Sequence, residues 1–119
     1  LTVLQLKSTL AVALYATATA TDTRRGNVFL LTELCDSSLR DLLRPARPLL
    51  GEQRCKELFA QLMVAVQACH DASYRHGDIK PENILLRCNE HGVAQVRLAD
   101  FGLASRQVVG EKCVLELAG

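Results

Sequence analysis

Three polar side chains that could act on a phosphate group lie close together in the sequence. Asp78, Lys80 and Asn83 fall within residues 76–83, which read His-Gly-Asp-Ile-Lys-Pro-Glu-Asn. On one short loop, a carboxylate could orient a hydroxyl, an ammonium group could neutralise a phosphate and a carboxamide could bind a metal ion. The apolar residues 84–86 follow and are expected to form a strand that holds the loop in place. The spacing indicates chemistry on phosphate groups.

A second short motif, Asp-Phe-Gly at residues 100–102, follows further along the chain. The two motifs together resemble the catalytic loop of eukaryotic protein kinases, H-R-D-x-K-P-x-N, and the D-F-G metal motif of that family. Every position of the loop pattern matches except one, because Gly77 stands where the family commonly has Arg. A three-residue match is weak by itself, but two motifs in the right order are much more specific.

The resemblance implies a distinct role for each of four side chains. Asp78 would orient the hydroxyl of the substrate and accept its proton, and Lys80 would bring positive charge to the γ-phosphate of ATP. Asn83 and Asp100 would bind Mg²⁺ through oxygen atoms, which hard cations prefer. Because Pro81 follows the lysine, the loop resembles that of the serine/threonine class. The implied function is ATP-dependent transfer of the γ-phosphate to Ser and Thr hydroxyls of a protein substrate.

Gly77 is the clear departure from the family pattern. In kinases that have Arg at this position, the guanidinium group pairs with a phosphate on the activation segment, a charge-assisted bond that glycine cannot make. We therefore expect this protein not to depend on that switch. Glycine is also expected to loosen the backbone beside Asp78, which would lower activity.

A nucleotide-binding connector is expected at residues 33–38, after an apolar strand at residues 28–32. Residues 39–43 read as a short helix with Ser37 or Ser38 as its N-cap. A strand that ends in a capped helix explains the same residues without any ligand. Resemblance to the kinase hinge instead assigns nucleotide contacts to Thr32 behind the adenine, the backbone of Glu33 and Cys35 at its edge, Ser38 at the ribose and Leu85 beneath the purine.

Apolar periodicity predicts a mixed α+β chain. Residues 10–15 read as a buried strand that continues through the alternating small and Thr residues 16–21, and a polar turn at residues 23–27 would connect it to the partner strand. Residues 84–86 and 94–98 predict a second hairpin.

A single long helix is predicted from residue 52 to about residue 72. Apolar side chains recur there at steps of three and four, which is the pattern of one buried helical face. The residues of that predicted face are Cys55, Leu58, Phe59, Leu62, Met63, Val66 and Cys69.

These elements correspond to part of a protein-kinase-like fold. We expect small-lobe strands in residues 1–32, the hinge in residues 33–38 and the start of the large lobe in residues 39–119. A chain of 119 residues is short for a two-lobed kinase, so an incomplete domain that is inactive by itself is expected. The sequence contains no G-x-G-x-x-G phosphate loop and no recognisable strand lysine for the phosphates.

Composition restricts the partners and the environment. The net charge is only +1, which gives no indication of nucleic-acid or anionic-membrane binding. The longest weakly polar run, residues 10–20, is too short to span a bilayer. Five cysteines without a C-x-x-C pair argue against a zinc site and a disulfide framework, and fit an intracellular, cytoplasmic protein with reduced thiols. The oligomeric state is unknown from the sequence.

Two other hypotheses remain beside the enzyme. A pseudokinase would keep the fold as a nucleotide-binding or scaffolding module without transfer activity, and a truncated product would be unable to fold alone because its hairpins expose edges. Retention of Asp78, Lys80, Asn83 and Asp100 together favours the enzyme. A phosphate loop and a strand lysine encoded upstream would separate these hypotheses.

Overall fold

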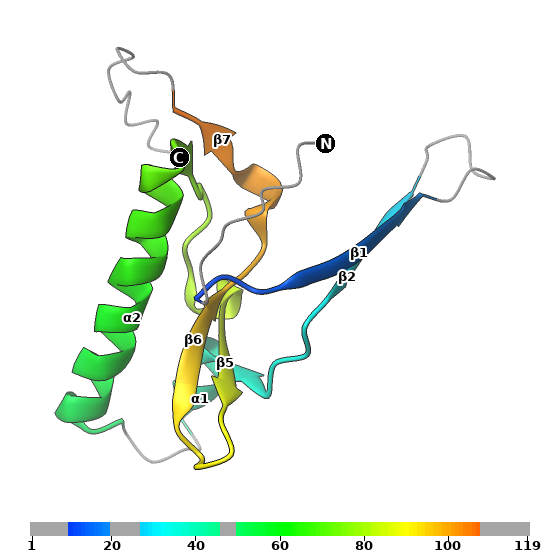
Figure 1. Ribbon diagram of the computed structural model, residues 1–119. Helices are drawn as coiled ribbons and strands as arrows, with labels where there is room; N and C mark the ends of the chain where they lie inside the picture. The colour runs from blue at the N-terminus through cyan, green and yellow to red at the C-terminus, as the bar shows by residue number, and fades with distance from the viewer. Residues whose placement is uncertain (1–9, 20–26, 46–49, 108–119) are drawn as a thin grey trace.

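The computed structural model describes residues 10–19, 27–45 and 50–107 of the chain. Its mixture of short strands and one long helix confirms the predicted α+β class (Figure 1). In chain order the elements are β1 (Leu14–Thr19), β2 (Val28–Thr32), β3 (Ser37–Ser38), α1 (Leu39–Leu42), α2 (Glu52–Asp71), β4 (Tyr74–Arg75), the 3-10 turn η1 (Pro81–Asn83), β5 (Ile84–Cys88), β6 (Ala94–Leu98), the 3-10 turn η2 (Phe101–Leu103) and β7 (Ser105–Arg106).

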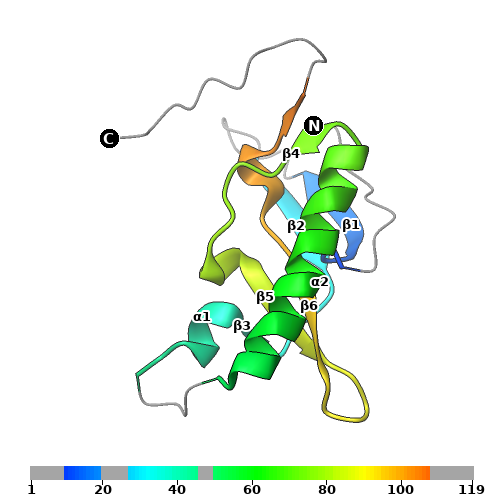
Figure 2. The same ribbon diagram turned by 90° about the vertical axis from the view of Figure 1, so that its left-hand side faces the viewer.

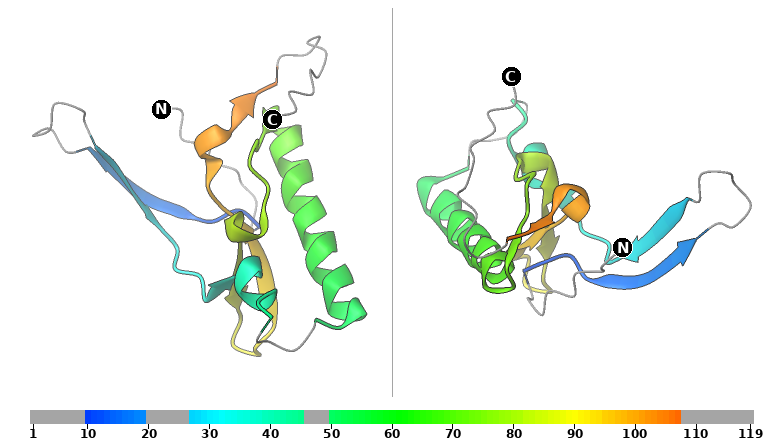
Figure 3. Two further views of the ribbon diagram at one scale, coloured as in Figure 1. Left: turned by 180° about the vertical axis from the view of Figure 1, so that it is seen from behind. Right: turned by 90° about the horizontal axis from the view of Figure 1, so that it is seen from above.

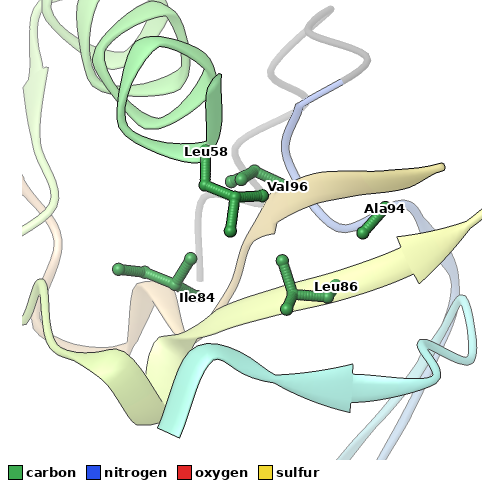
Figure 4. Packing of buried hydrophobic residues seen from close by; sticks show 5 residues of the cluster. All are labelled: Leu58, Ile84, Leu86, Ala94 and Val96. Atoms are coloured by element: carbon green, nitrogen blue, oxygen red, sulfur yellow. The ribbon is translucent and has the colours of Figure 1, made fainter. Parts of the chain in front are cut away.

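The body of the molecule is α2 packed on the β5–β6 hairpin, which Figure 2 shows with the helix in front of the two strands. Antiparallel pairing of β5 with β6 runs from Ile84 opposite Leu98 to Cys88 opposite Ala94 and confirms the predicted second hairpin. Alternate residues of both strands point toward the helix, as the period of two requires. Together with one helix residue they form a core cluster of Leu58, Ile84, Leu86, Ala94 and Val96 (Figure 4).

A second core cluster lies nearer the end of α2. Leu98 is fully buried there against Ala65 and Cys69 of the helix. Phe101 and Leu10 pack against this cluster from segments far apart in the sequence. The second cluster therefore joins the long helix to the segment that carries the Asp-Phe-Gly motif.

The predicted helix at residues 52–72 is confirmed, but part of its predicted buried face is wrong. Phe59 is 60% exposed and Met63 is 43% exposed, and Cys55 is exposed as well. The helix buries only the side that faces β6, where Leu58 and Ala65 lie. Phe59 lies about 100° around the helix from Leu58, so the hairpin cannot cover both. No described element covers the face that carries Phe59 and Met63.

The β1–β2 hairpin extends away from this body (Figures 1 and 3). Antiparallel pairing from Leu14 opposite Thr32 to Thr19 opposite Val28 confirms the predicted partner strands. The predicted buried strand at residues 10–15 is wrong in its start and its burial, because β1 begins at Leu14 and all its later residues are exposed.

Residues 10–12 lie outside the hairpin because they bind β6 instead. Leu98 donates its N–H to the carbonyl of Leu10 at 2.7 Å, and Val12 donates to the carbonyl of Leu98 at 2.9 Å. Ala11 thereby forms a parallel bridge with Leu98. The predictions for residues 20–26 in the turn, for residues 1–8 and for the segment beyond residue 107 lie outside the described residues.

A three-stranded sheet in the order β3-β5-β6 holds the connector beside the body. Ser37 lies opposite Leu86, and Ser38 lies opposite Leu85. Of the two predicted N-cap residues, Ser38 is the one that caps α1, and it forms a capping box with Asp41. Within the described residues, no helix is both long enough and apolar enough to cross a membrane.

Candidate active site

Residues 76–83 form the loop between β4 and β5, and the backbone geometry on either side fixes where the loop begins and ends. Ser73, directly before β4, has a left-handed backbone with φ of 61°, and pairing of β4 with β7 then fixes where the loop begins. Pro81 begins η1, where its fixed φ suits the first position of a helical turn. Asn83 N–H donates to the carbonyl of Lys80 at 2.9 Å and closes that turn. An ion pair between Arg40 of α1 and Glu82 connects the loop to its neighbour.

The structure brings Asp78, Lys80 and Asn83 into one hydrogen-bonded cluster. Oδ2 of Asp78 accepts hydrogen bonds from Nζ of Lys80 at 2.7 Å and from Nδ2 of Asn83 at 3.0 Å. The same carboxamide also donates to the backbone carbonyl of Asp78 at 2.9 Å. The aspartate carboxylate is therefore held in one orientation and remains partly exposed to solvent.

These contacts stabilise the ionised forms of both side chains. The hydrogen bond from Lys80 lowers the pKa of Asp78, against a smaller opposing effect of burial, and donation from Asn83 lowers it further. The same bond raises the pKa of Lys80. The cluster thus presents an ionised carboxylate and a charged ammonium group at neutral pH.

Asp100 is placed beside this cluster by its backbone. Ala99 N–H donates to the carbonyl of Asn83 at 2.9 Å, so the residue before Asp100 is bonded to the end of the loop. Asp100 has φ of 59° and ψ of 75°, and its Oδ1 accepts the N–H of Gly102 at 3.2 Å. Its negative charge also contributes to the raised pKa of Lys80. The two sequence motifs therefore converge around the Lys80 ammonium group.

His76 connects the two motifs through hydrogen bonds at both of its ring nitrogens. Its ring is buried, and Nδ1 accepts the N–H of Asp78 at 3.2 Å. Because Nδ1 accepts, Nε2 carries the proton and donates to the carbonyl of Ala99 at 2.9 Å. The ring also contacts Phe101, with centroids 4.7 Å apart.

Gly77 is in contact with the segment that follows the Asp-Phe-Gly motif. Its φ is +84°, and a Cβ added there would lie 2.6 Å from the backbone oxygen of Leu103. A side chain at this position would force the two segments apart. Besides being unable to bind a phosphate, the glycine therefore permits a close approach of two backbones.

The side chains of Asn83 and Asp100 fit a magnesium ion. No buried polar side-chain atom of the described residues lacks a partner, and the hydrogen bonds of Asn83 involve only Nδ2, so its Oδ1 must reach solvent. One carboxylate and one carboxamide oxygen suit Mg²⁺, which keeps several waters and shares phosphate ligands. In the described part of the chain, no group of three or more His, Cys, Asp or Glu side chains could hold a metal alone.

The connector, residues 33–36 in the structure, runs from Glu33, which binds two arginines on the face of the β5–β6 hairpin opposite to α2, to Asp36, which bonds to the backbone of β5. Leu85 is half-buried on that face, since Ile84 and Leu86 on either side of it point toward the helix. Thr32 at the end of β2 is exposed, and Cys35 is half-buried. Each of the residues predicted to contact the nucleotide therefore lies on or beside the connector.

Ser38 has a structural role in addition to the predicted contact with the ribose. Its Oγ donates to Oδ2 of Asp41 at 2.7 Å and accepts the N–H of Asp41 at 3.3 Å. Both bonds belong to the cap of α1.

Sequence reasoning missed the side chain of Glu33. Only its backbone was expected to matter, but its carboxylate is buried and binds Arg87 and Arg97. A usable signal was present, because strand alternation places both arginines on the outward face of the second hairpin, where they require an anion.

A mixed α+β arrangement, in which a His-x-Asp loop meets an Asp-Phe-Gly segment beside one long helix, is the architecture of a protein kinase catalytic centre. The family model described as "Protein kinase domain" matches residues 2–117, and the chain therefore belongs to the protein kinase family.

Curated relatives agree with this assignment. The chain is 38% identical over 84 residues to the serine/threonine-protein kinase PEPKR2 of Arabidopsis thaliana. The matched region is 69% of this chain and 17% of that protein. It is 34% identical over 87 residues to sperm motility kinase Z of Mus musculus, covering 72% and 16% respectively. Mitogen-activated protein kinase 6 of Oryza sativa is 34% identical over 84 residues, covering 68% and 21%. The matched region spans about a fifth or less of each of these relatives.

Proposed function

We propose that this chain carries the catalytic loop and the nucleotide connector of an ATP-dependent serine/threonine protein kinase. The hydrogen-bonded cluster of Asp78, Lys80 and Asn83, joined through Ala99 to Asp100, is the observation that carries the proposal. These four functional groups are those that positioning and charge neutralisation in phosphoryl transfer require.

Each side chain in the cluster has a defined task. Asp78 accepts a hydrogen bond from the substrate hydroxyl, orients its oxygen and takes up its proton, for which the carboxylate must be ionised, the form that its bond to Lys80 favours. Lys80 stabilises negative charge on the transferred γ-phosphate. Asn83 and Asp100 would hold Mg²⁺, which when bound neutralises the charge of the nucleotide phosphates.

The adenine binds at the connector in this proposal. The carbonyl of Glu33 and the N–H of Cys35 provide one acceptor and one donor, which match the donor and acceptor at the adenine edge. Leu85 lies on the same face of the hairpin and supplies an apolar contact to the purine. Thr32 lies behind the base, and Ser38 is near the ribose.

Ser and Thr hydroxyls of proteins are the proposed acceptors. The Lys80-Pro81 sequence supports this choice, and so do the printed names of relatives such as the serine/threonine-protein kinase of Arabidopsis thaliana. The described cysteines Cys35, Cys55, Cys69 and Cys88 are free, which supports an intracellular setting. Net charge near zero supports a protein partner over nucleic acid or a membrane.

Steady-state kinetics of two isosteric variants of the full-length protein test the assignment. Asp78→Asn should lower kcat by about a hundredfold or more and leave the KM for ATP nearly unchanged. Asp100→Asn should instead raise the Mg²⁺ concentration needed for half-maximal activity. Unchanged turnover in the Asp78 variant would refute the assignment.

Nucleotide binding without transfer by the wild-type protein would assign the pseudokinase function in place of the enzyme. The 119-residue chain by itself is expected to give no ATP turnover, because it contains no phosphate loop. Measurable turnover by the isolated chain would contradict that expectation.

A further inference from the structure

Glu33 is the most completely buried acidic side chain in the described part of the chain, with 4% of its side chain exposed. Oε2 accepts a hydrogen bond from Nη1 of Arg87 at 2.8 Å, and Oε1 accepts one from Nε of Arg97 at 3.2 Å. Oε1 also accepts the backbone N–H of Ala13 at 2.9 Å. One carboxylate therefore binds donors from β5, from β6 and from the residue before β1.

The charge of Glu33 is stabilised by these partners. Burial raises its pKa, but the Ala13 N–H and the Arg87 and Arg97 guanidinium groups together outweigh burial and leave the pKa below its usual value. A buried carboxylate without such partners would be strongly unfavourable. A hydrophobic side chain could fill the same space, but it would not fix the directions of three hydrogen-bond donors.

The other end of the connector is attached to the same hairpin. Asp36 donates its N–H to the carbonyl of Leu86 at 2.9 Å, and Oδ2 of Asp36 accepts the N–H of Cys88 at 2.7 Å. At the first end, the N–H of Glu33 donates to the carbonyl of Ala13 at 2.9 Å. Residues 33–36 are therefore held at both ends.

The middle of the connector, unlike its two ends, is exposed and has backbone groups without hydrogen bonds to other described residues. Leu34 is 91% exposed, and within the described residues no hydrogen bond engages the carbonyl of Glu33 or the N–H of Cys35. An acceptor and a donor are thus left available on a segment whose two ends are bonded to neighbouring strands.

We infer that Glu33 is a positioning residue for the nucleotide: its buried carboxylate does not touch the ligand but fixes the connector so that the backbone groups of Glu33 and Cys35 meet the adenine edge. This inference rests on the proposed binding of ATP at the connector. Preorganised donors and acceptors bind more tightly because less freedom is lost on binding. Loss of the charge should therefore weaken nucleotide binding selectively.

Glu33→Gln in the full-length protein tests the inference. The amide keeps the shape of the side chain and one oxygen for Ala13, but it loses the attraction to both arginines. The KM for ATP and the Kd for Mg-ADP should rise about tenfold, whereas kcat at saturating ATP and the KM for the protein substrate should change less than about twofold. Amide hydrogen exchange at Glu33 and Asp36, whose N–H groups are bonded to the carbonyls of Ala13 and Leu86, should become faster.

Two further variants separate positioning from general stability. Arg87→Gln removes a half-exposed partner, is less disruptive to folding, and should raise the KM for ATP about threefold. In the double variant with Glu33→Gln the two effects should not add, because they remove the same interaction. Glu90→Gln makes the same chemical change in the exposed turn of the same hairpin and should leave all these constants unchanged.

The outcomes distinguish this inference from the proposed function. Unchanged nucleotide affinity in folded Glu33→Gln and Arg87→Gln proteins would overturn the positioning role while leaving the proposed function intact. A fall in kcat at saturating ATP with no change in nucleotide affinity would also overturn it. A wild-type protein that binds no Mg-ADP would overturn the proposed function and this inference together.

Discussion

Gly77 lies where the loop of residues 76–83 and the segment after the Asp-Phe-Gly motif touch. Its positive φ and the 2.6 Å approach of a hypothetical Cβ to the Leu103 oxygen are two separate obstacles to any side chain. Gly77→Ala should therefore lower the free energy of unfolding by about 2 to 4 kcal/mol, measured by urea denaturation of the full-length protein.

Gly92→Ala is the matched control for the glycine prediction. Gly92 also has a positive φ, of 72°, but nothing lies within 4 Å of an added Cβ. This variant should lose only the free energy of unfolding that comes from backbone strain at positive φ, about 1 kcal/mol. Equal losses for Gly77→Ala and Gly92→Ala would show that the close approach to Leu103 is unimportant.

The ionisation of Glu33 should make the stability of the folded protein depend on pH. Its pKa in the folded protein is lowered below the ordinary value of 4.5, so its stabilising contribution is complete above that value and is lost as the pH falls through the lowered pKa. Arg87 stays charged over this range, because its hydrogen bond to Glu33 raises its pKa, and the Cys35 thiol, whose pKa is raised by burial and by Glu33, stays neutral.

The wild-type protein should therefore exceed Glu33→Gln in Tm at neutral pH, and the difference should shrink below pH 4.5. Calorimetry across that range is the measurement, with Glu90→Gln as the control. A difference in Tm that stays constant down to pH 3 would contradict an ionised, buried Glu33.

At the scale of single residues, the loop cluster could be predicted and the Glu33 cluster could not. Asp78, Lys80 and Asn83 lie within six positions, so a local motif brings them together wherever the loop folds as a unit. Glu33 meets Arg87 and Arg97, which are 54 and 64 residues away. Only the pairing of β3, which directly follows the connector, with β5 makes that contact possible.

The short helix α1 depends on its cap. With only four residues it gains little from its own hydrogen bonds, and Ser38 and Asp41 satisfy donors at its start. Ser38→Ala should cost about 1 kcal/mol in the free energy of unfolding.

Ser37→Ala is the control for the cap, since Ser37 lies in the same strand and does not cap the helix. Chemical denaturation of the two variants gives the comparison. A loss in Ser37→Ala as large as that in Ser38→Ala would place the stabilisation in the strand and not in the cap.

Among the elements, the existence of α2 and of both hairpins followed from apolar periodicity, whereas their surroundings did not. The start of β1 was predicted too early because residues 10–12 have strand-like sequence but bind Leu98 of β6. Periodicity also placed Phe59 and Met63 inside, since it identifies an apolar face without saying how much of that face a neighbour covers.

At the scale of the molecule, the β1–β2 hairpin is unusually apolar for an exposed element. Val28, Phe29, Leu30 and Leu31 of β2 are all exposed, and the hairpin extends away from α2 (Figure 3). Exposed apolar strands favour association between chains. The isolated 119-residue chain should therefore form concentration-dependent oligomers, measured by size exclusion with light scattering.

Substitution of the hairpin tests where that association occurs. Phe29→Ser with Leu31→Ser removes two apolar side chains from one face of β2 and should shift the isolated chain toward monomer. The same changes at Phe59 and Met63 on α2 serve as the comparison. A wild-type chain that stays monomeric at all concentrations would contradict the prediction.

The central claim is that the loop cluster transfers phosphate to a hydroxyl, and labelled ATP tests it most directly. Full-length protein should transfer label from the γ-phosphate to Ser or Thr of a general protein substrate, only with Mg²⁺ present, and Asp78→Asn should abolish the transfer. Label incorporated equally by Asp78→Asn, or by neither protein although both bind Mg-ADP, would contradict the account.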